Sequence, residues 1–153
     1  MSHAMALAAI ALFAVLNLIT GPAMAVGTDD GSSDSASAGD YDQAKAAVDA
    51  GDFAAALPIL TAITKAEPQN ADAWNLLGFT HRMLGHNDES AQAYLVVLDI
   101  NPNHLGALEY QGELFINTGK MDLAKANLAK LQSLCGTCEE YEDLDKALKA
   151  AGA

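Results

Sequence analysis

The chain has few aromatic residues, few cysteines and few basic residues. Aromatic side chains make up 6% of its 153 residues, and only two cysteines are present. Two thiols are too few for a four-thiolate zinc site or a dense disulfide scaffold. Lysine and arginine together number 8 against 20 acidic residues, which gives a formal net charge of -12. So acidic a chain is a poor ligand for nucleic acid or for an anionic membrane surface.

Charged residues are also missing from the first 28 positions, which are predominantly apolar. An apolar run from Ala4 to Thr20 is followed by the helix breaker Gly21-Pro22 and the small-residue end Ala23-Met24-Ala25. This order predicts a signal peptide over residues 1–25, cleaved after Ala25, and a periplasmic or secreted mature protein. Because no lysine or arginine precedes the apolar run, a retained anchor and a folded helix stay as alternatives.

The segment 26–39 is rich in glycine, serine, alanine and aspartate. Apart from Val26 it has no large apolar side chain, so it cannot bury enough surface to offset the entropy lost on ordering. We predict a flexible acidic linker here and a folded domain over residues 40–153. The apolar fraction of the chain, 51%, is enough for a core. It is dominated by alanine, which favours helices over strands.

A repeat with a period of 34 residues runs through this domain. Gly51, Gly85 and Gly119 are spaced by 34, as are Pro68 and Pro102. Glycine suits the left-handed end of a first helix, and proline stops a second helix. Residues with capping side chains follow these stops, and we expect Asp52, Asn70 and Asn103 to cap the helices that come next. Pro58 falls inside a predicted helix, where we expect a kink or a lost hydrogen bond.

The repeated positions resemble the signature of the tetratricopeptide repeat (TPR) family. Its residues here are Trp74, Leu77, Gly78, Gly85, Tyr94 and Pro102. The resemblance implies an all-α fold, a TPR-like right-handed superhelix of three helix hairpins with a C-terminal capping helix. The repeats are expected at about 37–70, 71–104 and 105–136. Tyr141, Leu144 and Leu148 share one face of the capping helix, expected at about 139–150. The other helices are expected at about 40–50, 53–66, 71–84, 88–100, 104–118 and 121–134.

In the TPR family the first helices line a concave groove that holds peptide segments. Carrying the inward positions over to this sequence gives a set of candidate partner-binding residues: Asn75, Phe79, Arg82, Met83, Glu109 and Glu113. Asn75 would hydrogen-bond the ligand backbone, Phe79 and Met83 would hold an apolar side chain, and the single arginine would pair with a carboxylate. The alternative is that these are ordinary solvated residues on a shallow surface.

Cys135 and Cys138 form a C-x-x-C motif between the third hairpin and the last helix. Haem attachment would need a histidine where Glu139 stands, and a thioredoxin-like pair would need a preceding strand. Zinc would need two more ligands, and the histidines have no paired spacing. A structural disulfide is therefore predicted, since an exported chain enters an oxidising compartment. A redox role stays open because Cys138 lies near a helix start.

We find no pairing of nucleophile and base, no phosphate loop and no H-E-x-x-H motif. His81 stands at a helix-packing position, and surface roles are expected for His86 and His104. The sequence therefore predicts a non-catalytic exported adaptor or scaffold with no cofactor and no metal, which binds a protein or peptide partner. No binding to nucleic acid, or to a membrane after signal cleavage, is expected. The alternative is a periplasmic redox or assembly factor that acts through the Cys135-Cys138 pair.

Overall fold

The structure is a computed structural model that describes residues 33–152, with side chains from residue 38 onward. The predicted signal peptide and the first part of the predicted linker lie outside the described residues. Within the described range the chain forms seven α-helices and no strand. They are α1 (Ser33–Asp49), α2 (Phe53–Ala66), α3 (Ala71–Met83), α4 (Asn87–Ile100), α5 (Leu105–Asn117), α6 (Met121–Cys135) and α7 (Glu139–Ala150).

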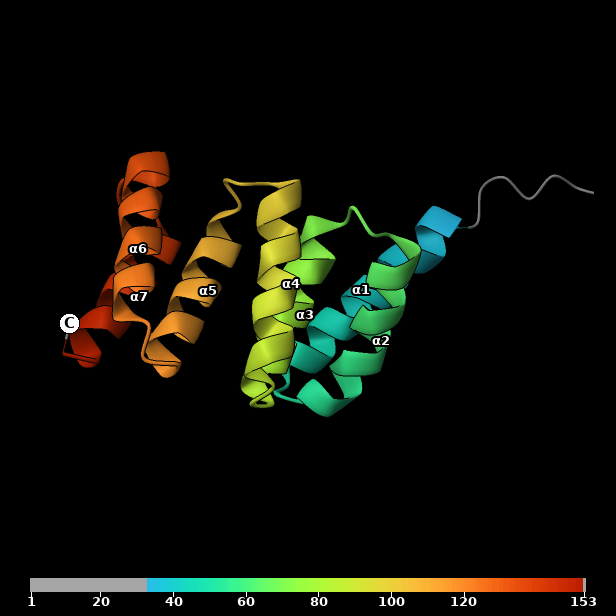
Figure 1. Cartoon of the computed structure of the whole chain (residues 1–153). Coiled ribbons are helices and arrows are strands. Elements are labelled where there is room, and N and C mark those ends of the chain that lie inside the picture. Colours follow the sequence, from blue (N-terminus) through green and yellow to red (C-terminus); the bar gives the residue numbers. More distant parts are fainter. Residues whose placement is uncertain (1–32, 153) are drawn as a thin grey trace, which may run out of the picture.

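Consecutive helices pack in pairs, α1 with α2, α3 with α4 and α5 with α6. The pairs stand in a row along the chain, from the blue-green end to the orange-red end in Figure 1. The last helix, α7, packs against both α5 and α6. The all-α stack of three hairpins and a capping helix is thus confirmed. In the part of the chain that the structure describes, no helix is long and apolar enough to cross a membrane.

The turns inside the hairpins depend on the three glycines of the 34-residue repeat. Gly51, Gly85 and Gly119 have φ angles of 76°, 79° and 74°. A side chain at this left-handed conformation would be strained, so glycine is the residue that fits. The repeat period therefore identified the three hairpin turns correctly.

The helix caps agree with the sequence at two places and differ at a third. The side chains of Asp52 and Asn70 accept hydrogen bonds from the backbone N–H groups of Ala55 and Ala73, as predicted. The prediction for Asn103 was wrong. The residue at the cap of α5 is His104, whose Nδ1 accepts the N–H of Ala107 at 3.2 Å.

The first helix begins earlier than the sequence indicated. It starts at Ser33 rather than near residue 40, so the last part of the predicted linker is helical. Alanine at positions 36 and 38 lets the helix extend across a segment that its serines and glycine disfavour. The second helix runs from Phe53 to Ala66 and includes Pro58. The helix therefore continues through the proline, although proline has no N–H to donate.

The interior of the stack forms where large side chains meet glycine. Tyr94 of α4 is fully buried, and its ring packs directly over Gly78 of α3. A methyl group on Gly78 would lie 2.6 Å from the tyrosine Cε1. Ser90 stands where the family usually has alanine, and its hydroxyl donates a 2.8 Å hydrogen bond to the Gly78 carbonyl. The buried polar atom is thus satisfied, and it fixes α4 against α3.

The capping helix closes the third hairpin in a similar way. Leu144 and Leu148 of α7 are buried against Leu108 and Leu131. The Leu144 side chain occupies the space above Gly112, where a methyl group would lie 2.5 Å from its Cδ2. The predicted apolar face of this helix is therefore the one that packs on the stack.

Candidate functional site

Three aromatic rings meet on one face of the stack, where Phe53 at the start of α2 joins Phe79 of α3 and Tyr110 of α5. Phe79 of α3 lies 5.9 Å from Phe53 and 5.0 Å from Tyr110, measured between ring centroids. These rings border a pocket of about 280 Å³, which Tyr41, Val48 and Leu76 also line. The rings are only partly buried, so this pocket offers an apolar surface to a ligand.

Arg82 extends this face toward the C-terminal end of the stack. Its guanidinium carbon lies 5.3 Å from the Phe79 centroid and 5.8 Å from the Tyr110 centroid, within reach of cation–π attraction. It also forms an ion pair with Glu113 of α5, and its side chain is only 12% exposed. The role predicted for Arg82, pairing with a ligand carboxylate, thus meets a carboxylate already present in the protein. Beyond it lies a pocket of about 370 Å³ between α5 and α7, lined by Ile116 and Asn117 among others.

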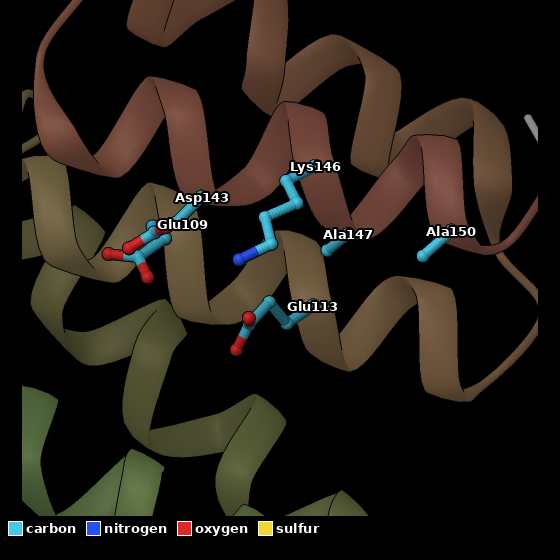
Figure 2. A pocket seen from close by; sticks show the side chains of 6 residues that line it. All are labelled: Glu109, Glu113, Asp143, Lys146, Ala147 and Ala150. Carbon is cyan, nitrogen blue, oxygen red and sulfur yellow. The ribbon is translucent and has the colours of Figure 1, made fainter.

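The side chain of Glu109 forms the acidic part of this face. Together with Glu113, Asp143 and Lys146 it lines a pocket of about 260 Å³ between α5 and α7 (Figure 2). Glu109 is only 8% exposed. Burial raises the pKa of its carboxyl group to about 8, and the nearby charges of Glu113 and Asp143 add to the rise. A carboxyl group of this kind changes its charge within the physiological pH range.

The other two candidates occupy different surroundings. The Oδ1 of Asn75 is buried and has no hydrogen-bond partner among the described residues. Its amide nitrogen lies against Gly106 of the next hairpin, so this side chain contacts the neighbouring repeat. Met83 is 47% exposed and lines none of the three pockets described above. Whether Met83 joins Phe79, four residues earlier on the same helix, in holding an apolar side chain stays a prediction.

Several residues of this face were not among the predicted candidates. Tyr110 and Leu76 are equivalent positions, 34 residues apart, and both line the aromatic pocket. Each lies four residues after an inward position and three before the next one, a spacing that could have revealed them. Ala147 and Ala150 of α7 line the pockets beside Glu113, because the capping helix contributes a wall to the groove.

The histidines are held by local contacts. His81 and His86 place their Nδ1 atoms 3.4 Å apart, and burial together with the neighbouring imidazole lowers the pKa of His81. His104 was expected at the surface, yet it caps α5 through Nδ1, so its Nε2 carries the proton and donates to Asp72 at 3.0 Å. Within residues 33–152 no three histidine, cysteine or acidic side chains gather as metal ligands.

The two cysteines lie next to each other at the junction of α6 and α7. Their α carbons are 5.6 Å apart, with both sulfur atoms at bonding distance. Cys135 ends α6, and Cys138 is the residue that precedes the first turn of α7. That first turn contains three glutamates, Glu139, Glu140 and Glu142. Their negative charge opposes the stabilisation that a helix start would give to a thiolate.

Replacing Glu109 with glutamine is expected to change how stability depends on pH. The carboxyl group has a raised pKa in the folded protein, so folding becomes less favourable as pH rises from about 4.5 toward 8. The variant removes this loss and is expected to gain on the order of 2 kcal/mol over wild type between about pH 5 and pH 8. Urea unfolding of both proteins at the two pH values measures this difference. Parallel pH curves for the two proteins would contradict it.

Comparisons with known proteins agree with this architecture. Residues 41–104 match the sequence profile of the tetratricopeptide repeat family. No curated protein sequence matches the chain. Among solved structures, the Yersinia enterocolitica type III secretion translocator chaperone SycD is similar, with a TM-score of 0.69 and 16% identity over 77% of this chain and 92% of its own. The Arabidopsis OM64 TPR domain is also similar, with a TM-score of 0.69 and 16% identity over 76% of this chain and 96% of its own.

A third similar structure was determined with a bound peptide. It is the first TPR of Spaghetti (RPAP3) bound to the HSP90 peptide SRMEEVD, with a TM-score of 0.67 and 15% identity over 76% of this chain and 94% of its own. Residues 41–104 thus match the tetratricopeptide repeat by sequence, and the helical domain has the fold of the solved TPR structures.

Proposed function

We propose that this protein is an exported, non-catalytic TPR adaptor that holds a segment of a partner protein against the face formed by α1, α3, α5 and α7. The observation that carries the proposal is the partly exposed aromatic cluster of Phe53, Phe79 and Tyr110 beside its pocket. Rigid aromatic side chains supply a large contact area and lose little conformational entropy on binding. A segment that buries them gains most of its affinity there.

Two similar structures support a binding role. One is named as a translocator chaperone, and another holds a peptide of HSP90. Because these two structures are 16% and 15% identical to this chain, they show that the fold is shared and do not identify the ligand. The groove of this protein therefore has to be tested on its own residues.

Phe79→Ala and Tyr110→Ala are expected to weaken partner binding by about tenfold or more each, because both remove an anchor from the aromatic pocket. Wild type and variants, immobilised at equal density, are incubated with extract of the native cells, and captured proteins are quantified by mass spectrometry. Leu95→Ala is the matched control, since Leu95 is 62% exposed on α4, outside the described pockets. Recovery of the same proteins in the same amounts by all four would refute the groove.

Export is supported by the leader sequence up to Ala25 and by the paired cysteines. The intact mass of the protein purified from its native cells is expected to correspond to a chain that begins at Val26. A mass that includes the leader would show that the segment is retained, and export with cleavage would then be wrong.

The cysteine pair separates the adaptor from a redox or assembly factor. We propose a structural disulfide that fastens α7 to α6, because the three glutamates after Cys138 disfavour a reactive thiolate. The variant Cys135→Ser/Cys138→Ser is expected to lose about 2 kcal/mol of stability, the value for closing so short a loop. Urea unfolding measures it. A pair that mild reductant opens at once, and that forms mixed disulfides with exported proteins, would favour the redox factor instead.

A further inference from the structure

The pocket between α5 and α7 combines a buried carboxyl group with an excess of negative charge. Glu109 forms its base and Asp143 an exposed rim, and their carboxyl groups lie close together in Figure 2. Glu109 is 8% exposed, yet no hydrogen bond or ion pair to its side chain is found among the described residues. A buried acidic group without such a partner is costly when ionised.

The cations nearby do not balance this charge. Arg82 already forms an ion pair with Glu113. Lys146 is the basic side chain among the residues that line the pocket. The Lys146 side chain reaches over the pocket in Figure 2, but within the described residues it forms no ion pair. Glu140 adds a further negative charge that acts on Glu109. A second cation placed in the pocket would therefore be attracted by several carboxylates at once.

We infer that this pocket receives a lysine or arginine side chain of the partner segment, so that the groove selects cationic peptides. The inference rests on the proposed function, because the pocket belongs to the same face as the aromatic cluster. Glu113 and Arg82 connect the two, since Arg82 lies over the Phe79 and Tyr110 rings and pairs with Glu113 beside the pocket. A segment that places an apolar side chain on the rings and a cation beside Glu109 fits both parts.

The test uses three pools of short fluorescent peptides that share fixed leucine and phenylalanine positions. Their other positions are randomised between serine and lysine, serine and glutamine, or serine and glutamate. Fluorescence anisotropy at low ionic strength measures their affinity for the mature protein. The lysine pool is expected to bind about tenfold tighter than the glutamine pool, as a partly desolvated ion pair allows, and the glutamate pool more weakly still.

Matched variants distinguish the pocket from the general negative charge of the protein. Glu109→Gln is expected to lose most of the preference for lysine, and Asp143→Asn part of it. The control Asp122→Asn removes one exposed carboxylate from the first turn of α6, and it is expected to keep the preference. An equal loss in Asp122→Asn would mean that only long-range attraction is at work, and the inference would be wrong.

Proton release gives a second measurement. A cation in the pocket favours the ionised form of Glu109, so the affinity of the lysine pool is expected to rise between about pH 6 and pH 9. The charged groups facing Glu109 are Arg82 of α3, Glu113 of α5, and Glu140, Asp143 and Lys146 of α7. The rise is expected to disappear in Glu109→Gln. An identical rise in that variant would show that another group is responsible.

The outcomes separate this inference from the proposed function. If the pools bind and Phe79→Ala weakens them, but lysine is not preferred, the groove stands and the cation pocket is wrong. If no pool binds, or if Phe79→Ala changes nothing, both fail. A thermal shift with calcium chloride that Glu109→Gln abolishes, in the absence of any lysine preference, would assign the pocket to a metal ion and overturn the inference.

Discussion

Replacing Tyr94 with alanine is expected to lower the free energy of unfolding by about 3–5 kcal/mol, the range for truncating a buried aromatic side chain. Tyr94 is fully buried and packs with Val97, Ala107 and Leu114, so its ring joins the second hairpin to the third. Urea unfolding followed by circular dichroism measures the loss. The exposed Leu95 on the same helix provides the control, and Leu95→Ala is expected to change stability by less than about 0.5 kcal/mol.

A substitution at Gly78 tests the contact between this glycine and the Tyr94 ring. Gly78→Ala places a methyl group 2.6 Å from the Tyr94 ring, a clash expected to exceed the gain in helix propensity of about 1 kcal/mol. The double variant Gly78→Ala/Tyr94→Leu has no ring at this position. The stability losses of the single variants Gly78→Ala and Tyr94→Leu are therefore expected to sum to more than the loss of the double variant. Simple additivity would mean that the ring moves away from Gly78 without difficulty.

Replacing Leu144 with alanine is expected to cost about 2–5 kcal/mol, because it leaves a cavity where α7 meets the stack. Leu144 is fully buried above Gly112, and Leu148 is the other buried residue of α7. Beyond the global loss, hydrogen exchange of the α7 amides is expected to accelerate more than that of α3. Equal acceleration in both helices would mean that α7 is not a separately anchored cap.

A double variant tests whether the leucine and the glycine form one unit. Gly112→Ala alone would place a methyl group 2.5 Å from the Leu144 Cδ2 and is expected to destabilise the protein. In Gly112→Ala/Leu144→Ala the added methyl group partly fills the cavity. We therefore expect the double variant to be more stable than Leu144→Ala, and a less stable double variant would contradict the proposed packing.

The repeat made most of the fold predictable from the sequence. Gly51, Gly85 and Gly119 marked the hairpin turns because a left-handed backbone conformation has a strong residue preference. Asp52 and Asn70 marked helix starts for a similar reason, since their side chains can accept a backbone hydrogen bond. Both signals depend on local backbone conformation, so they predict turns and helix starts without knowledge of the tertiary contacts.

The differences arose where a tertiary contact decided the outcome. Asn103 was the better cap by residue type, but His104 caps α5 while its other nitrogen binds Asp72 of the previous hairpin. The side-chain nitrogens of a histidine allow it to serve both contacts at once. Residue preferences alone do not reveal a second partner 32 positions away.

The candidate site was predictable in position but not in its electrostatics. Phe79, Arg82, Glu109 and Glu113 do line pockets on the expected face. The pairing of Arg82 with Glu113 and the burial of Glu109 depend on how α5 packs against α3 and α7. A repeat signature describes one hairpin at a time and contains no information about such contacts. Whether these residues bind a partner stays a prediction that the groove variants test.

The packing of α7 on the third hairpin also determines where further repeats can be added to the stack. Because α7 packs on both helices of the third hairpin, it takes the place that the first helix of a further unit would need. A complete 34-residue unit duplicated between two hairpins would keep every contact between neighbouring hairpins. A unit appended after Ala150 would instead meet the outward side of α7, whose exposed residues are mainly charged. Repeats added before α7 would therefore leave it at the C-terminal side, and the same helix can end arrays of different length.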